Sequence, residues 1–240
     1  MARPSRASRP SLTYLVAVVL AIAAASGAGC FRRRIGPNDA YRDPRVAAER
    51  WRQLFEGEDR EIYRQRARIM QLAAVKRGTT VVDVGAGTGL FSMMLSDAVG
   101  ETGRVYAEEI MEKFSSFIAA RAEHEHRSNV VSVMGTETGI GLPPASVDFV
   151  FACDVYHHFD HPAQMLASLH SALRPGGEML LVDFAREPGL SPEWILEHVR
   201  AGKAQVLREV EAAGFTLVTT DDSVGINYAL RFRRAPEGRP

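Results

Sequence analysis

The chain has 240 residues, of which 46% are hydrophobic and 8% aromatic, enough to bury one good core, so one main domain is expected. Its 29 basic and 29 acidic side chains balance, but six arginines precede the first acidic residue, Asp39. The remaining 23 basic and 29 acidic residues give the body a formal charge of −6. This argues against a nucleic-acid surface, because such a surface needs a basic stripe. The two cysteines are too few for a disulfide framework.

Residues 1–30 are typical of a targeting segment: three arginines, an apolar run over residues 12–25, and the small residues SGAG before Cys30. The run is short and Ala-rich for a membrane span, which needs about 20 strongly apolar residues. The tetrad GAGC resembles the lipobox of bacterial lipoproteins, although Gly27 stands where that family prefers Leu. We therefore expect a signal peptide or membrane-anchor leader, through which the protein would associate with a membrane.

Residues 32–34 are all arginine, and positive charge directly after an apolar run resists translocation. The expected location is the cell envelope, with the side of the membrane left open and a cytoplasmic location as the alternative. Residues 31–58 are expected to form a linker and an N-terminal helix, the helix lying in the segment PRVAAERWRQLFE. A second helix is expected from about Ile62 until Gly78 stops it.

Short apolar runs then alternate with helical patterns. Strands are expected at residues 79–85, 103–110, 129–135, 146–154 and 178–184. Helices are expected at residues 90–100, 111–124 and 162–173, the last closed by the segment RPGG. Two more helices, at residues 191–200 and 203–214, precede a pair of strands in residues 215–234 around a turn at residues 222–225.

Nearly continuous apolar strands that alternate with helices predict a parallel sheet covered on both faces. Right-handed crossovers make this a doubly wound α/β fold, and the short connection near the C-terminus forces an antiparallel pair. The prediction is a mostly parallel seven-stranded sheet with a C-terminal antiparallel hairpin. The domain is expected to span residues 59–234, with a disordered tail at residues 235–240.

The segment VVDVGAGTGL is the most informative motif, because it joins the first predicted strand of the sheet to its helix. Glycines there let the backbone turn tightly and approach a ligand closely. The dinucleotide fingerprint is G-x-G-x-x-G, whereas here Gly85, Gly87 and Gly89 are evenly spaced, with Asp83 two residues ahead. At this point the chain resembles the class I S-adenosylmethionine-dependent methyltransferases, which have this Rossmann-like fold.

The resemblance implies S-adenosylmethionine as the cofactor, bound by the loop residues Asp83, Gly85, Ala86, Gly87 and Gly89. It implies that Glu109, at the end of the second strand, accepts hydrogen bonds from the ribose hydroxyls, with Glu108 as the alternative if the register slips.

After the third and fourth strands, the resemblance assigns adenine contact to Thr136 and Glu137, although Asp is commoner than Thr at the first position. It also places Asp154 at the cofactor. These elements follow one another in the family's order through most of the domain.

The segment CDVYHHFDHP follows the fourth predicted strand and contains three of the chain's seven histidines. Because this loop faces the cofactor crevice, Tyr156 is expected to position the acceptor or cofactor. Either His157 or His158 is expected to be the general base, since the pKa of histidine, about 6.5, suits proton removal. Packing of one histidine of the pair is the open alternative.

A metal site is disfavoured in this loop, because adjacent histidines usually point apart and structural zinc sites have four ligands. His161 or Asp160 is expected to cap the following helix. Cys153 is expected to be a strand core residue.

The sequence thus predicts a methyltransferase that acts on a small-molecule acceptor, with no nucleic-acid partner. The acceptor and the oligomeric state stay undetermined. Two alternatives remain: a module that binds the cofactor without turnover, and an NAD-dependent oxidoreductase, which the glycine spacing disfavours.

Overall fold

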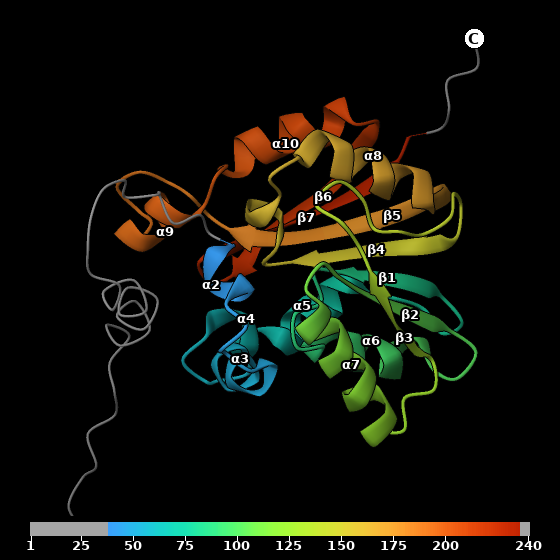
Figure 1. Cartoon of the computed structure of the whole chain (residues 1–240). Helices are drawn as coiled ribbons and strands as arrows, with labels where there is room; N and C mark the ends of the chain where they lie inside the picture. The colour runs from blue at the N-terminus through green and yellow to red at the C-terminus, as the bar shows by residue number, and fades with distance from the viewer. Residues whose placement is uncertain (1–37, 236–240) are drawn as a thin grey trace, which may run out of the picture.

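The computed structural model describes residues 38–235, which form a single seven-stranded sheet with helices on both faces (Figure 1). The strand order is β3-β2-β1-β4-β5-β7-β6. Strands β1 to β5 pair in parallel, whereas β7 pairs antiparallel with both β5 and β6. The strands are β1 (Thr80–Val84), β2 (Arg104–Glu109), β3 (Val130–Met134), β4 (Val147–Cys153), β5 (Leu173–Phe184), β6 (Phe215–Val224) and β7 (Asn227–Arg234). The predicted sheet and its antiparallel hairpin are confirmed.

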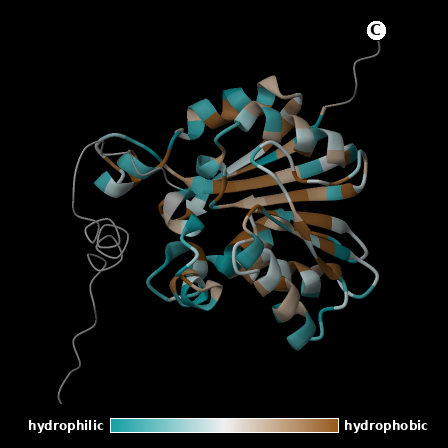
Figure 2. Cartoon of the chain, in the orientation of Figure 1, coloured by the Kyte–Doolittle hydropathy of each residue, from teal (hydrophilic) through white to brown (hydrophobic). Residues whose placement is uncertain are grey.

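The helices cover the two faces of this sheet. They are α2 (Asp39–Arg42), α3 (Ala48–Phe55), α4 (Glu61–Arg64), α5 (Arg66–Ala73), α6 (Leu90–Val99), α7 (Glu112–His124), α8 (Pro162–Ala172), α9 (Glu193–His198) and α10 (Lys203–Ala212). In β1, Val81 packs in a core with α5 and α6, whereas Val82 packs in a second core with α8 and α10. This alternation along one strand is what a doubly wound sheet requires. Figure 2 shows the result as hydrophobic strands between helices that are polar outside.

Three boundaries differ from the sequence prediction. The helix expected over residues 62–78 is divided into α4 and α5 and ends at Ala74, whose left-handed φ of 47° closes it before Gly78. The segment RPGG does not lie between helix and strand, because β5 begins directly at Leu173. The terminal hairpin turns at residues 225 and 226 rather than at 222–225, because β6 pairs as far as Val224.

The described part of the predicted linker, residues 38–58, packs onto the domain. Trp51 of α3 is buried in one cluster with Phe114 of α7. The targeting segment, with its lipobox-like tetrad, and the predicted disordered tail beyond residue 235 lie outside the described residues. Within residues 38–235, no helix has the length and apolar character needed to cross a bilayer.

Candidate functional site

One pocket lies where the carboxyl ends of β1, β2 and β4 meet. Most of its lining comes from the glycine loop (residues 85–89), the end of β2, the loop after β3, the turn after β4 and the N-terminal helices, and α6, α7 and α8 contribute a few residues. Open parallel sheets bind ligands at this edge. The predicted residues that line it are Asp83, Gly85, Ala86, Gly87, Glu108, Glu109, Thr136, Glu137, Asp154 and His158.

The glycine loop has left-handed backbone at alternate positions, with φ of 60° at Gly85 and 58° at Gly87. A Cβ atom on Gly85 would stand 2.3 Å from the Val155 side chain, so no larger residue fits there. The Ala86 N–H donates to the Glu108 carbonyl (2.9 Å), which fixes the loop to β2. Gly89 does not line the pocket. Instead it forms the N-cap of α6 and faces Ile118.

Side-chain hydrogen bonds of Asp83 and Thr88 connect the glycine loop to the neighbouring helices. The buried Asp83 carboxylate accepts a hydrogen bond from the Ser92 hydroxyl (2.6 Å), and burial raises its pKa to about 7. Thr88 donates to Glu56 (3.0 Å), which also pairs with Arg121 (2.6 Å). The loop is therefore tied to α6, α7 and the end of α3 before any ligand binds.

Glu108 and Glu109 differ in what their carboxylates contact. Glu108 is 1% exposed and accepts from the Gly85 N–H (3.1 Å), while its Oε1 is buried without a partner among the described residues. Glu109 is 7% exposed and accepts from the Ile110 N–H (3.2 Å) at the start of the next loop. Burial raises the pKa of Glu108 to about 7 and that of Glu109 to about 8. Both Glu108 and Glu109 line the pocket, so the geometry is compatible with either carboxylate as the ligand of the ribose hydroxyls.

The loop after β3 brings Thr136 and Glu137 to the pocket, as the resemblance implies. Both residues are exposed, and Glu137 pairs with Arg42 of α2 (2.5 Å). The N-terminal segment is thereby joined to the loop that borders the pocket.

Asp154, directly after β4, has a left-handed φ of 59°, which is uncommon for a residue with a side chain. Its Oδ2 pairs with Arg60, whose guanidinium lies 4.5 Å from the centre of the Phe55 ring. The other carboxylate oxygen is buried with no partner in the part of the chain that the structure describes. Asp154 thus presents an unsatisfied acceptor beside the pocket.

His157 is 3% exposed and is held by Asp183, at the end of β5. Its Nδ1 lies 2.7 Å from Asp183 Oδ1, and its backbone N–H donates to Asp183 Oδ2 (3.0 Å). Burial disfavours the charged ring, but the Asp183 carboxylate outweighs burial, and the pKa of His157 is raised. With Nδ1 bonded to a carboxylate, Nε2 is the ring nitrogen that remains available.

His158 lines the pocket and has its Nδ1 buried without a partner among residues 38–235. Its ring lies between Tyr41 of α2 (5.3 Å between centroids), His157 (4.0 Å) and His198 of α9 (5.2 Å). Burial, with the neighbouring imidazoles, lowers the pKa of His158 well below its usual value. Burial, with the nearby His157 imidazole, also lowers the pKa of His198 to about 4.

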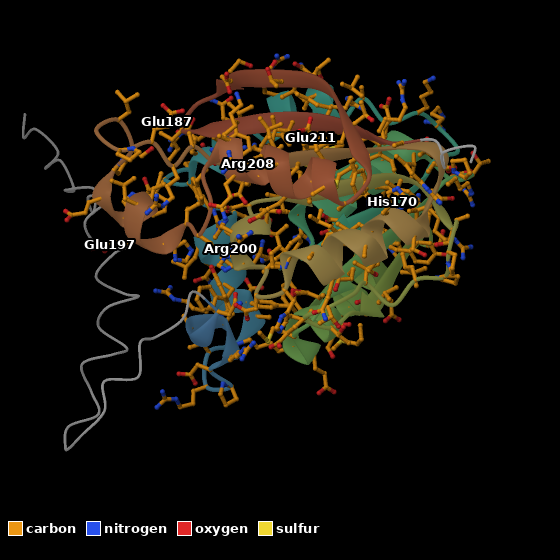
Figure 3. All side chains as sticks on the ribbon, turned by 90° about the horizontal axis from the view of Figure 1, so that it is seen from above. His170, Glu187, Glu197, Arg200, Arg208 and Glu211 are labelled. Carbon is orange, nitrogen blue, oxygen red and sulfur yellow. The ribbon has the colours of Figure 1, made fainter. Side chains whose placement is uncertain are left out.

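Tyr156 does not reach the pocket, and the role predicted for it is wrong on this geometry. The ring is 1% exposed within the α8 and α10 core, and its hydroxyl donates to Glu209 of α10 (2.6 Å). Glu209 also pairs with Arg200, labelled in Figure 3 (2.8 Å). Tyr156 points away because the turn Tyr156–His158 is a 3-10 helix, which directs successive side chains about 120° apart.

Two smaller expectations also change. Cys153 is a partly buried residue that lines the pocket rather than a pure core residue. His161 occupies the N-cap of α8, but no side-chain capping bond forms there.

Sequence reasoning missed several residues that reach the site from distant parts of the chain. Asn38, Tyr41, Phe55 and Arg60 come from the N-terminal segment predicted as linker and helix. The sequence could not have identified them easily, because the periodicity of an amphipathic helix predicts a buried face but not the part of the fold against which that face packs.

The residues present fit S-adenosylmethionine. The glycine loop offers backbone without Cβ atoms at Gly85 and Gly87, and six acidic residues line the pocket, two of them with a buried oxygen that has no partner among the described residues. Such a lining favours a ligand that carries positive charge and hydroxyl donors, as a sulfonium nucleoside does.

The comparisons with known proteins agree with this fit. Residues 82–181 match a family described as a methyltransferase domain. Demethylmenaquinone methyltransferase of Listeria welshimeri is 26% identical over 129 residues, which are 54% of each chain. A chloroplastic protein of Arabidopsis thaliana, named as an uncharacterized methyltransferase, is 28% identical over 66% of this chain and 47% of its own. The chain spans about half the length of the curated relatives it matches.

Solved structures show the same fold. A SAM-dependent methyltransferase from Aquifex aeolicus has a TM-score of 0.71 at 23% identity, covering 79% of this chain and all of its own. The [4+2]-cyclase SpnF has a TM-score of 0.63 at 14% identity, covering 72% of this chain and 80% of its own. A shared fold alone does not fix the reaction. The family match, the relatives and the pocket agree: residues 82–181 match a methyltransferase domain, and together with the fold they support a class I S-adenosylmethionine-dependent methyltransferase with S-adenosylmethionine as the cofactor.

Proposed function

We propose that the protein transfers a methyl group from S-adenosylmethionine to a small acceptor that enters beside His158. The observation that carries this proposal is the continuity of one pocket from the glycine loop and Glu109, past Asp154, to His158. The family match favours methyl transfer over the NAD-dependent alternative.

When bound, the cofactor supplies an electrophilic methyl group, so the work of this chain is to orient the two reactants and exclude water. We assign cofactor binding to the glycine loop, Glu109 and the loop at Thr136 and Glu137. We assign help in removing the acceptor proton to the pair His157 and His158, of which His158 faces the pocket and His157 is oriented by Asp183.

The acceptor that suits this lining is an aromatic ring with an ionisable hydroxyl. Three aromatic side chains line the pocket, where an apolar ring would pack: Tyr41, which contacts His158, with Phe55 and Phe159. The names of the Listeria relatives and of a ubiquinone/menaquinone C-methyltransferase of Escherichia fergusonii, 27% identical over 115 residues, agree with a quinone-like ring.

The test is an incubation of the protein with S-adenosylmethionine labelled in its methyl group and a panel of phenols and hydroquinones. We expect acceptor-dependent label in the product, with S-adenosylhomocysteine released in equal amount. Cofactor binding without any acceptor-dependent release across the panel and a metabolite extract would instead favour the binding module without turnover.

We also propose that the leader holds the domain at a membrane. S-adenosylmethionine is a cytoplasmic metabolite, so turnover requires the domain to face the cytoplasm, in agreement with the arginines at residues 32–34. A fusion of alkaline phosphatase after residue 40 should then stay inactive, and strong activity would place the domain outside.

A further inference from the structure

Three imidazole rings meet beside the pocket, from two separate segments of the chain. His157 and His158 come from the turn after β4, and His198 comes from α9, at the edge of the molecule next to α2 (Figure 1). Each ring can offer one nitrogen so that all three nitrogens lie within 4.8 Å of one another. The rings of His157 and His198 are 5.0 Å apart between centroids.

The orientation of His157 is that of a metal ligand. Its Nδ1 is bonded to the Asp183 carboxylate, which also accepts from the Phe184 N–H (2.7 Å) and cannot swing away. A histidine that ligates a metal typically donates its other ring N–H to a carboxylate in this way, which fixes the tautomer and leaves Nε2 for the ion.

His158 supplies a second indication. Its Nδ1 is buried and has no hydrogen-bond partner among the described residues, although buried polar atoms are normally satisfied. Simple packing of the rings explains their contacts but leaves this nitrogen without a partner, whereas an ion shared with His157 and His198 gives it one.

A second group, Asp154, His157 and Asp183, also brings three candidate atoms within 4.8 Å. Although Asp154 Oδ1 has no partner among the described residues, an ion there would have to compete with Arg60 for Asp154 and with His157 for Asp183. The three imidazoles are therefore the better ligand set.

We propose that His157, His158 and His198 bind one divalent transition-metal ion of the Zn²⁺ type, with Asp183 as the carboxylate that orients His157. Three histidines with an open fourth position are a known arrangement for catalytic zinc, and imidazole nitrogen suits such ions. Zinc–nitrogen bonds of about 2.0 Å place tetrahedral ligand nitrogens about 3.3 Å apart, so nitrogens now within 4.8 Å need only a small closure.

The open position would face the pocket, because His158 lines it. An acceptor hydroxyl bound there would have its pKa lowered by the ion, and this role rests on the proposed methyl transfer. The inference deepens the assignment of His157 and His158, which would assist proton removal as ligands rather than as a free base.

The test measures metal binding directly, without turnover. The full chain is prepared without a polyhistidine tag, stripped with a chelator, and titrated with Zn²⁺ against a chromophoric chelator and with Co²⁺ by visible absorption. We expect one equivalent per chain and Co²⁺ bands typical of a low coordination number. We expect His198→Ala to weaken binding more than about 100-fold and Asp183→Asn to weaken it about 10-fold to 100-fold.

His124→Ala is the matched control, because His124 lies on the exposed end of α7, outside the cluster. It should bind as the unchanged protein does. His198 is only partly buried, so its variant should fold, which S-adenosylmethionine-dependent thermal stabilisation will verify.

Zn²⁺ affinity that is equal in the His198→Ala and His124→Ala proteins would overturn the site, as would less than one equivalent bound at excess metal. Metal binding by a protein that transfers no methyl group would support the site while contradicting the proposed function. Methyl transfer by a protein that binds no metal would overturn the site alone.

Discussion

The two sides of the pocket are built differently. On the cofactor side, the glycine loop and Glu109 follow two neighbouring parallel strands, and backbone hydrogen bonds such as Ala86 N–H to the Glu108 carbonyl hold them. On the histidine side, His157, Asp183 and His198 come from the ends of β4 and β5 and from α9, and side chains make the contacts. The cofactor side can therefore be damaged by backbone changes, and the histidine side by loss of single functional groups.

The largest expected effect is on the cofactor side. Gly87→Val should abolish stabilisation by S-adenosylmethionine, because its side chain would enter the pocket from a residue with φ of 58°. Gly189→Val is the control: φ there is 86° with no atom within 4 Å, so it bears similar strain, about 1–2 kcal/mol, away from the pocket. Thermal shift with and without cofactor measures both. A retained shift in Gly87→Val would contradict this placement of the loop.

The second prediction separates the two sides. His158→Ala should reduce turnover by about 10²-fold or more while leaving cofactor affinity unchanged, because His158 lines the pocket where we propose that the acceptor enters. Steady-state kinetics and isothermal titration calorimetry measure the two quantities. His170→Ala, on α8, provides the comparison histidine. If turnover survives in His158→Ala, the histidine pair has only a packing role.

The third prediction distinguishes the two glutamates. Glu109→Gln should weaken S-adenosylmethionine binding about 10-fold to 100-fold, because hydrogen bonds to a charged group contribute about 1.5–3 kcal/mol. Glu108→Gln should weaken it less, since its carboxylate is directed at the Gly85 N–H. Calorimetric titration of both variants decides, and the reverse order would assign the ribose to Glu108.

The fourth prediction uses the raised pKa values of the cofactor side, about 7 for Asp83 and Glu108 and about 8 for Glu109. As pH falls through this range, these acids take up protons and lose their attraction for a cation. Affinity for S-adenosylmethionine should therefore rise between pH 6 and 8, the window in which these pKa values lie. Affinity for S-adenosylhomocysteine, which lacks the sulfonium charge, should rise less. Equal pH profiles for the two ligands in calorimetry would argue against ionisation of these acids on binding.

The smallest effect is expected for Tyr156→Phe. Removal of the hydroxyl that donates to Glu209 should lower the free energy of unfolding by about 1 kcal/mol, with kcat unchanged, because the ring lies in the core and not in the pocket. Urea unfolding and the methyl-transfer assay measure the two. A large loss of kcat at unchanged stability would return Tyr156 to the site.

Much of this protein could be predicted from the sequence because the relevant signals are local. The order of strands and helices follows from hydrophobic periodicity, and the glycine spacing marks the loop after β1, where Gly85 and Gly87 take the left-handed backbone that glycine tolerates. The ends of the elements were less certain. The break between α4 and α5 and the start of β5 at Leu173 depend on packing that no short window contains.

By itself, the sequence determined the doubly wound fold and which loops meet at the pocket, since parallel strands bring consecutive loops to one edge of the sheet. Only the tertiary structure decided the histidine side. In the folded chain, Tyr156 is buried in the core and donates to Glu209, and His157 is bonded to Asp183, 26 residues away. His198 of α9 packs against both His157 and His158. The physical reason is that side-chain direction in a 3-10 turn, and the approach of a distant helix, depend on what the folded chain packs against each of them.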